Sequence, residues 1–206
     1  MRDALLAAGI RWGSLASLVA ASAAIMGSPG PATISLVAVV SSVGVRRALP
    51  YAAGIVLGTA LVLVAVACGI TVTLLAVPGL RPVLIGVSAA YVVWLAYRIA
   101  TAPAAPAPGT AAAPSVGAGT VLGVANPKGW VAIAAVFASG RLFASTAADG
   151  AAKIAVLSGM IVAIMGTWLL AGASLAPVLR RPRAARVVNV AFAVLLIASS
   201  ALTVVR

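Results

Sequence analysis

The chain of 206 residues contains no histidine and only two acidic residues, Asp3 and Asp149. General acid–base pairs, Ser/His nucleophilic sites and zinc sites are built from histidine or from clustered carboxylates, so their usual forms are excluded. A proton relay through intramembrane carboxylates or histidines is not expected for the same reason, because the chain has no histidine and neither Asp lies in a predicted span. We therefore expect no catalytic residue, no metal site and no cofactor, and we expect that the protein is not an enzyme.

Cysteine is also scarce, since Cys68 is the only one. A single cysteine cannot form an internal disulfide, so it does not indicate a redox compartment. Because Cys68 lies inside an apolar run, we expect it to be buried and to pack as a small apolar side chain.

Hydrophobic runs are what the chain has in abundance. It is 64% hydrophobic and 8% charged, with a mean hydropathy of +1.21, values that ordinary soluble domains do not reach. Most of the uncharged runs meet the roughly 20 residues that a membrane-spanning helix needs. We place the spans at about residues 12–41, 50–76, 82–101, 117–139, 153–176 and 186–205. The predicted fold is all-α: a polytopic membrane protein with about six transmembrane helices.

The first apolar run also has features of a secretory signal peptide. Arg2 and Arg11 precede it, and Ala21-Ser22-Ala23 looks like a cleavage site. However, the run continues without a charge to Val45, well beyond the roughly 7 to 15 residues of a signal-peptide core. We therefore expect it to be retained as the first helix.

A segment rich in proline and alanine divides the chain into halves. Residues 101–117 read TAPAAPAPGTAAAPSVG, a composition that stays extended and solvated. We predict a single transmembrane transporter domain over residues 1–206, with three helices in 1–101, a linker at 102–116 and three helices in 117–206. Because three is odd, the second half enters the membrane from the opposite side, which predicts two inverted three-helix repeats.

The net charge of +12 would indicate nucleic acid as the partner of a soluble protein. Here nearly all the cations, Lys153 among them, lie at predicted span ends, where they anchor to lipid headgroups. The expected partner is the lipid bilayer, and no nucleic acid is expected.

The two membrane faces carry nearly equal numbers of cations. The dense cluster from Arg180 to Arg186 favours placing its face in the cytoplasm and both termini outside, whereas the basic N-terminus favours the reverse.

The sequence GSPGPAT, residues 27–33, breaks the first span. Pro29 and Pro31 lack an N–H group and clash with the preceding turn, and Gly30 can adopt conformations closed to other residues. We expect the helix to unwind at 28–31, with its freed groups facing a cavity. A half-helix starting at Pro31 would point its positive N-terminal end into that cavity, which suits a carboxylate. The alternative is a proline kink that only shapes packing.

The sequence NPKGW, residues 126–130, breaks the fourth span. Lys128 falls at the centre of 117–139, where a lone ammonium costs about 2.5–3.5 kcal/mol, so a functional site is the default interpretation. Asn126 adds a donor and an acceptor, and Pro127 loosens the helix. The alternative is a helix that begins near Asn126, with Lys128 reaching the interface, but its uncharged remainder would be too short to span.

Together the two breaks predict a cavity for an anionic head such as the carboxylate of an amino acid. Aromatic walls could come from Tyr91, Trp94 and Tyr97, or from Trp130 or Trp168, although such residues at span ends are as often interface anchors. The predicted substrate-binding residues are Ser28, Pro29, Gly30, Pro31, Tyr91, Asn126, Pro127 and Lys128.

These motifs together resemble the LysE/RhtB family of bacterial amino-acid exporters. The matching segments are SPGP at 28–31, a loosely kept run with Arg47, Ala48, Ala53, Gly54 and Gly58, AAYVVWLAYR at 89–98, and NPK at 126–128. The resemblance covers nearly the whole chain. It implies a multi-pass protein of the bacterial inner membrane that exports amino acids or close derivatives, driven by an ion gradient. It also assigns residues 29–31 and 126–128 to the central site.

The chain departs from the family at one position. Many members carry an acidic residue in the fifth span, where this chain has Gly166 within IMGTW. This puts in doubt carboxylate-based proton coupling and recognition of a cationic side chain. A neutral or apolar amino acid is therefore the better prediction for the substrate.

The predicted function is secondary export of amino acids, neutral ones first, or of related small metabolites by alternating access. Two alternatives come from other classes: a passive small-solute channel, and a membrane-embedded accessory subunit that binds a partner protein. The exact substrate, the coupling ion, the orientation and homo-oligomer formation stay open at this stage.

Overall fold

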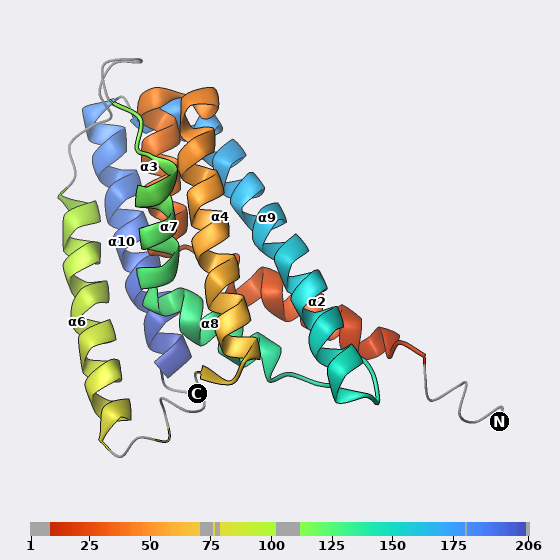
Figure 1. The fold of residues 1–206 in the computed structure, drawn as a ribbon. Coiled ribbons are helices and arrows are strands. Elements are labelled where there is room, and N and C mark those ends of the chain that lie inside the picture. Colours follow the sequence, from red (N-terminus) through yellow and green to blue (C-terminus); the bar gives the residue numbers. More distant parts are fainter. Residues whose placement is uncertain (1–8, 71–75, 77–78, 102–111, 180, 205–206) are drawn as a thin grey trace.

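The computed structural model describes residues 9–70, 76, 79–101, 112–179 and 181–204. Within these residues it contains eight helices and no strand, so the all-α prediction is confirmed (Figure 1). The helices are α2 (Trp12–Ile25), α3 (Pro31–Val43), α4 (Val45–Ala67), α6 (Leu80–Ala100), α7 (Val116–Ala125), α8 (Pro127–Phe137), α9 (Thr146–Leu179) and α10 (Pro182–Val204).

Two of these helices, α4 and α9, are long and apolar enough to cross a membrane. A third span is added if α7 and α8, which meet at an angle of 61°, count as one broken span. These counts cover the described part of the chain only, and six spans in two inverted repeats remain a prediction. Helices α4 and α9 begin earlier than predicted, at Val45 and Thr146, whereas α4 ends at Ala67, before the predicted limit of 76. At the two starts, charged residues end the hydrophobic run without ending the helix.

Cys68 lies just past the end of α4 and is exposed, so the prediction that it is buried was wrong. The apolar run continues beyond this point, but α4 ends at Ala67. Burial therefore stops with the helix.

Helix α3 forms the centre of the bundle. Most of its residues are buried, as expected for a helix with others packed around it. Leu36 and Val40 pack with α4 and α9, whereas Ile34 packs with α6 and α10. Ser41 donates a hydrogen bond of 3.1 Å to the carbonyl of Gly172, which fixes α3 against α9. The end of the first break is therefore held in a rigid frame.

Helices α4 and α7 approach each other most closely at four glycines. Gly54 and Gly58 of α4 face Gly119 and Gly123 of α7. A Cβ atom added to Gly123 would lie 2.9 Å from the Cα of Gly58, which real Cβ contacts do not tolerate. Small residues at this spacing let two helix backbones touch. The first half of the second broken span is thereby fixed to α4.

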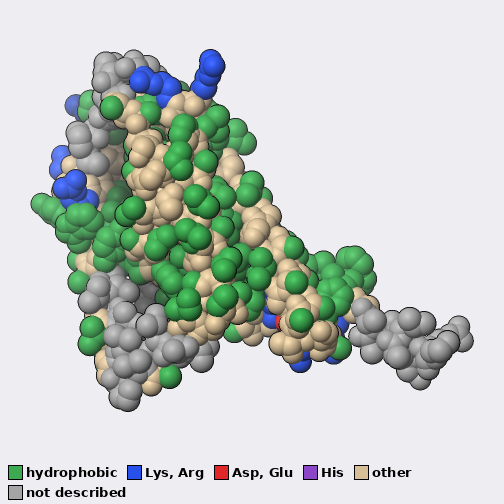
Figure 2. Space-filling model, in the orientation of Figure 1, with side chains coloured by type: hydrophobic (Ala, Val, Ile, Leu, Met, Phe, Trp, Pro, Cys, Tyr) green, Lys and Arg blue, Asp and Glu red, His purple; other side chains and the backbone are tan. Residues whose placement is uncertain are grey.

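At the other end of the bundle, α2 and α8 run across the axis of α4 and α9 (Figure 1). Leu18 of α2, Ile133 of α8 and Leu157 of α9 are fully buried in one cluster with the end of α4. Hydrophobic side chains cover much of the face seen in Figure 2, and Lys and Arg side chains gather toward the helix ends. This distribution suits a bundle surrounded by lipid.

A buried ion pair fixes the turn between α8 and α9. Lys153 Nζ lies 3.2 Å from Asp149 Oδ2 and donates hydrogen bonds of 2.9 Å to the carbonyls of Phe137 and Ser139. Asp149 Oδ1 accepts hydrogen bonds from backbone N–H groups in the turn, that of Leu142 among them at 2.5 Å. Lys153 is only 4% exposed, so it is not the headgroup anchor that its place at a span end predicted. It holds the last carbonyls of α8 instead.

Replacing Gly58 by leucine should destabilise the bundle by about 1–3 kcal/mol, because the side chain would overlap the backbone of α7. Gly159→Leu in α9 is the matched control, since an added Cβ there meets nothing within 4 Å. Thermal unfolding of the purified proteins in detergent should show a lower midpoint for Gly58→Leu only. Equal midpoints would mean that the glycine contact is not tight.

Breaking the buried ion pair from one side should also destabilise the protein. Lys153→Met or Asp149→Asn alone should each cost on the order of 3 kcal/mol, because each leaves a buried charge without its partner. The double variant should lose clearly less than the sum of the two, as measured by unfolding in detergent. Strict additivity would show that the two side chains do not interact.

Candidate functional site

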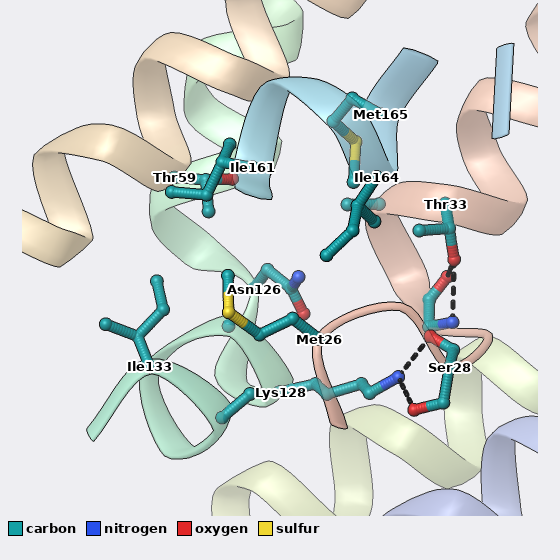
Figure 3. Close-up of a pocket in the computed structure, with 14 residues that line it drawn as sticks. Met26, Ser28, Thr33, Thr59, Asn126, Lys128, Ile133, Ile161, Ile164 and Met165 are labelled. Carbon is teal, nitrogen blue, oxygen red and sulfur yellow. Dashed lines mark hydrogen bonds between the residues drawn. The ribbon is translucent and has the colours of Figure 1, made fainter. Parts of the chain in front are cut away.

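The two broken segments meet at Lys128. Its Nζ donates hydrogen bonds to the carbonyl of Ser28 and to Ser28 Oγ at 2.7 Å (Figure 3). It also donates to the carbonyl of Pro29 at 2.8 Å. Residues about one hundred positions apart in the chain are thus joined through one ammonium group. The structure therefore brings together Ser28, Pro29 and Lys128 from the two motifs singled out in the sequence.

The first break runs from the end of α2 to Gly30, as the two prolines predicted. Its freed polar groups find partners in neighbouring side chains, as buried backbone requires. Trp168 Nε1 donates to the carbonyl of Gly27 at 3.0 Å, and Ser28 Oγ donates to that of Ile25 at 2.8 Å. The Gly30 N–H donates to Thr33 Oγ1 at 2.8 Å. The non-helical segment is consequently held in one conformation by the helices around it.

Glycine is needed at position 30 for a different reason from the one predicted. Its backbone is extended, with φ −158° and ψ 178°, a conformation open to residues other than glycine. However, a Cβ atom would lie 2.7 Å from Lys128 Cδ and 3.2 Å from its Nζ. The missing side chain makes room for the lysine, which the sequence around residue 30 alone did not reveal.

The second break is a sharp corner between α7 and α8. Asn126 is the residue before α8, Pro127 is the first residue of that helix, and Lys128 is the second. Trp130 Nε1 donates to the carbonyl of Val124 at 2.8 Å, which satisfies one group at the end of α7. Lys128 is therefore at the start of a half-helix, directly after the break that Pro127 predicted.

A cavity of about 40 Å³ lies between the two breaks. Its polar wall is formed by Ser28, Gly30, Thr33, Thr59, Asn126 and Lys128, and its apolar wall includes Met26, Ile133, Ile161, Ile164 and Met165 (Figure 3). This volume accepts a few water molecules but is smaller than an amino acid. A substrate of that size needs the walls to move apart.

The cavity has a positive electrostatic character. Helices α3 and α8 both begin at the breaks, so the positive ends of two helix dipoles point toward the region between them. The sequence had predicted this arrangement for α3 only. Among the described residues the one carboxylate is that of Asp149, which is paired with Lys153, so Lys128 has no acidic partner there. The arrangement favours an anionic group as the ligand.

Not all of the predicted site residues line the cavity. Pro31 and Pro127 form the first turns of α3 and α8. Tyr91 lies on α6, where its ring stacks on that of Trp94 with centroids 5.8 Å apart, and it is not among the lining residues. Trp94 and Tyr97 are largely exposed, which is typical of interface anchors.

The contributions of α4 and α9 to the cavity were missed in the sequence. Thr59 lines the cavity from α4, and Ile161, Ile164 and Met165 line it from α9. A polar residue within an apolar span was a usable signal for Thr59. The residues of α9 carry no signal of this kind, because they look like any other apolar positions.

Comparison with known proteins gives one result. The model of one protein family, described as LysE type translocator, matches residues 23–205, which include both breaks. No match was found among curated proteins or among solved structures. The family match confirms the resemblance inferred from the motifs, and its members are membrane transporters of small solutes. With nearly its whole length matched, the chain belongs to the LysE type translocator family.

Proposed function

We propose that the protein is a secondary transporter that exports neutral amino acids or closely related small metabolites across the bacterial inner membrane. The observation that carries this proposal is the Lys128 ammonium, which one break places on the carbonyls of the other, beside a cavity. Such a cation inside the membrane region is expensive and marks a substrate pathway. Membership in a family of small-solute exporters supports the same conclusion.

The substrate would bind through its carboxylate. The Lys128 ammonium is the donor that suits this group, and the positive N-terminal ends of α3 and α8 favour the same charge. The apolar wall, with Ile133, Ile161 and Met165, suits an uncharged side chain. No carboxylate from the described residues lines the cavity to receive a cationic side chain, which favours neutral amino acids over lysine or arginine.

Binding would also act on the contact between the two halves of the chain. In the structure all three protons of Lys128 Nζ are donated to Ser28 and Pro29. A substrate carboxylate competes for these protons and so weakens the connection between the breaks. The change in shape that transport requires would then follow from substrate binding, because a ligand shifts a conformational equilibrium by its differential affinity.

The packing of the half-helices supports alternating access. Helix α7 is fixed along α4 by the glycine contact, and α3 is fixed along α9, whereas α2 and α8 lie across the opposite end of the bundle. We propose that α3 and α7, which are fixed in this way, close the cavity toward one side of the membrane. The state that opens toward that side would arise when the two inverted repeats exchange conformations.

The distribution of Lys and Arg indicates which end of the bundle faces the cytoplasm. The starts of α4 and α10 lie at the upper end in Figure 1 and carry Arg46, Arg47, Arg181, Arg183 and Arg186. Basic residues gather at that end of the surface (Figure 2). We propose that this end faces the cytoplasm, because cytoplasmic loops are enriched in Lys and Arg.

Lys128→Ala should reduce export by about tenfold or more, since the variant loses charge-assisted hydrogen bonds to the substrate. The measurement is efflux from bacterial cells loaded with a panel of amino acids by dipeptide feeding. Arg183→Ala, which removes an exposed cation at the bundle end, should export like the wild type. Membrane insertion of each variant is verified by its level in the membrane fraction.

Two results would contradict the proposal. If the efflux of every amino acid from cells with the inserted wild-type protein is no faster than from empty-vector cells, the accessory-subunit alternative is favoured. If proteoliposomes show efflux without saturation or counterflow, the protein is a passive channel. Efflux that survives Lys128→Ala would place the substrate site elsewhere.

Gly30→Ala should reduce export nearly as strongly as Lys128→Ala, because the added methyl group displaces the lysine side chain. Gly13→Ala near the start of α2 is the control, since an added Cβ there meets nothing within 4 Å. Combining Gly30→Ala with Lys128→Ala should add little further loss in the same efflux assay. Independent losses from the two substitutions would show that Gly30 acts by another route.

A further inference from the structure

Asn126 has a buried polar atom without a partner. The residue is 7% exposed, and its side-chain Oδ1 is the one buried side-chain oxygen or nitrogen of the described residues that lacks a hydrogen bond. Groups of this kind are rare, because leaving a buried acceptor unpaired costs about 1–3 kcal/mol. The amide therefore needs an explanation from its surroundings.

The usual role of an asparagine at this position is not used. Asn126 directly precedes α8, where the side-chain oxygen of asparagine normally accepts a hydrogen bond from the first turn. Here the side chain makes no such cap, although Gly129 lies close enough that a Cβ there would be 3.4 Å from Nδ2. Instead Asn126 lines the cavity together with Lys128 and Met26 (Figure 3).

The other side-chain donors of the cavity wall are already used. The Lys128 ammonium donates to Ser28 and Pro29. Thr33 Oγ1 donates to the carbonyl of Gly30 at 3.0 Å, and Thr59 Oγ1 donates to that of Ile55 at 2.8 Å. The side chains of the cavity wall thus leave Asn126 Oδ1 without a donor, and a molecule bound in the cavity can supply one.

We infer that Asn126 is a specificity-determining residue whose Oδ1 accepts a hydrogen bond from the α-ammonium group of the substrate. This inference rests on the proposed function, in which the carboxylate of the substrate lies at Lys128. An α-amino acid carries its ammonium and carboxylate groups on one carbon, and Asn126 and Lys128 present an acceptor and a donor from the same corner of the chain. The site thereby selects α-amino acids over carboxylates that lack the amino group.

Paired ligands test this selection. Binding to the detergent-purified full-length protein is measured by competition against radiolabelled valine, leucine and methionine. The competitors are each unlabelled amino acid and its counterpart without the amino group, such as 3-methylbutanoate for valine. The wild type should bind the amino acid about ten- to a hundredfold more tightly than its counterpart, because a site that hydrogen-bonds an N–H group rejects the analogue that lacks it.

Asn126→Leu, similar in size and without an acceptor, should bring the two affinities within about threefold of each other by weakening the amino acid alone. Asn126→Asp keeps an acceptor oxygen and should retain the selection. Thr167→Val on α9 is the control, since it removes an exposed hydroxyl outside the cavity, and it should behave as the wild type.

The outcomes separate this inference from the proposed function. If Lys128→Ala abolishes binding but Asn126→Leu keeps the wild-type ratio of affinities, a water molecule satisfies Oδ1 and the inference alone is wrong. An equal loss for both ligands in Asn126→Leu, or loss of selection in Asn126→Asp, would show a structural role and overturn it too. If the wild type binds none of these amino acids, the proposed function and the inference fail together.

Discussion

The rest of the site depends on one ammonium group held by backbone carbonyls. Lys128 compensates the groups that the first break leaves without helical partners, and those groups in turn solvate a charge that would be costly in hydrocarbon. Each break therefore makes the other tolerable. The contact is made of dipoles and not of a carboxylate, so the charge of the lysine stays available to an anionic ligand. A stronger ion pair at the same place would bind the two segments more tightly and leave less for the substrate.

The surrounding helices explain how so irregular a backbone is kept in place. Two tryptophan side chains, Trp168 and Trp130, each satisfy a carbonyl at one break. Most of helix α3 is buried, and α7 is held to α4 at Gly58 and Gly123. Helices α2 and α8 lie across the other end of the bundle, where Leu18 and Ile133 are buried against α4 and α9. Each corner is consequently held by packed helices on both of its sides.

The sequence predicted the all-α fold, the two breaks and the meeting of Lys128 with the SPGP segment. Proline and a charged residue in an apolar run are strong local signals, because each is expensive in a membrane helix. The sequence did not predict the burial of Lys153, the distance of Tyr91 from the cavity or the part played by Thr59. These depend on which helix faces which, and a uniformly apolar helix carries little information about its orientation. The sequence also did not show why residue 30 is a glycine, because Lys128, which occupies the space beside it, is far away in the chain.

The fit between Gly30 and Lys128 limits how the protein can change in evolution. The lysine stem occupies the space where a side chain of residue 30 would be. A larger residue at 30 therefore requires the lysine side chain to move or residue 128 to be shorter, and a shorter residue at 128 leaves space that a larger residue at 30 can fill. The effect of a mutation at either position depends on the residue present at the other. We therefore expect residues 30 and 128 to change together, although about one hundred residues of chain separate them.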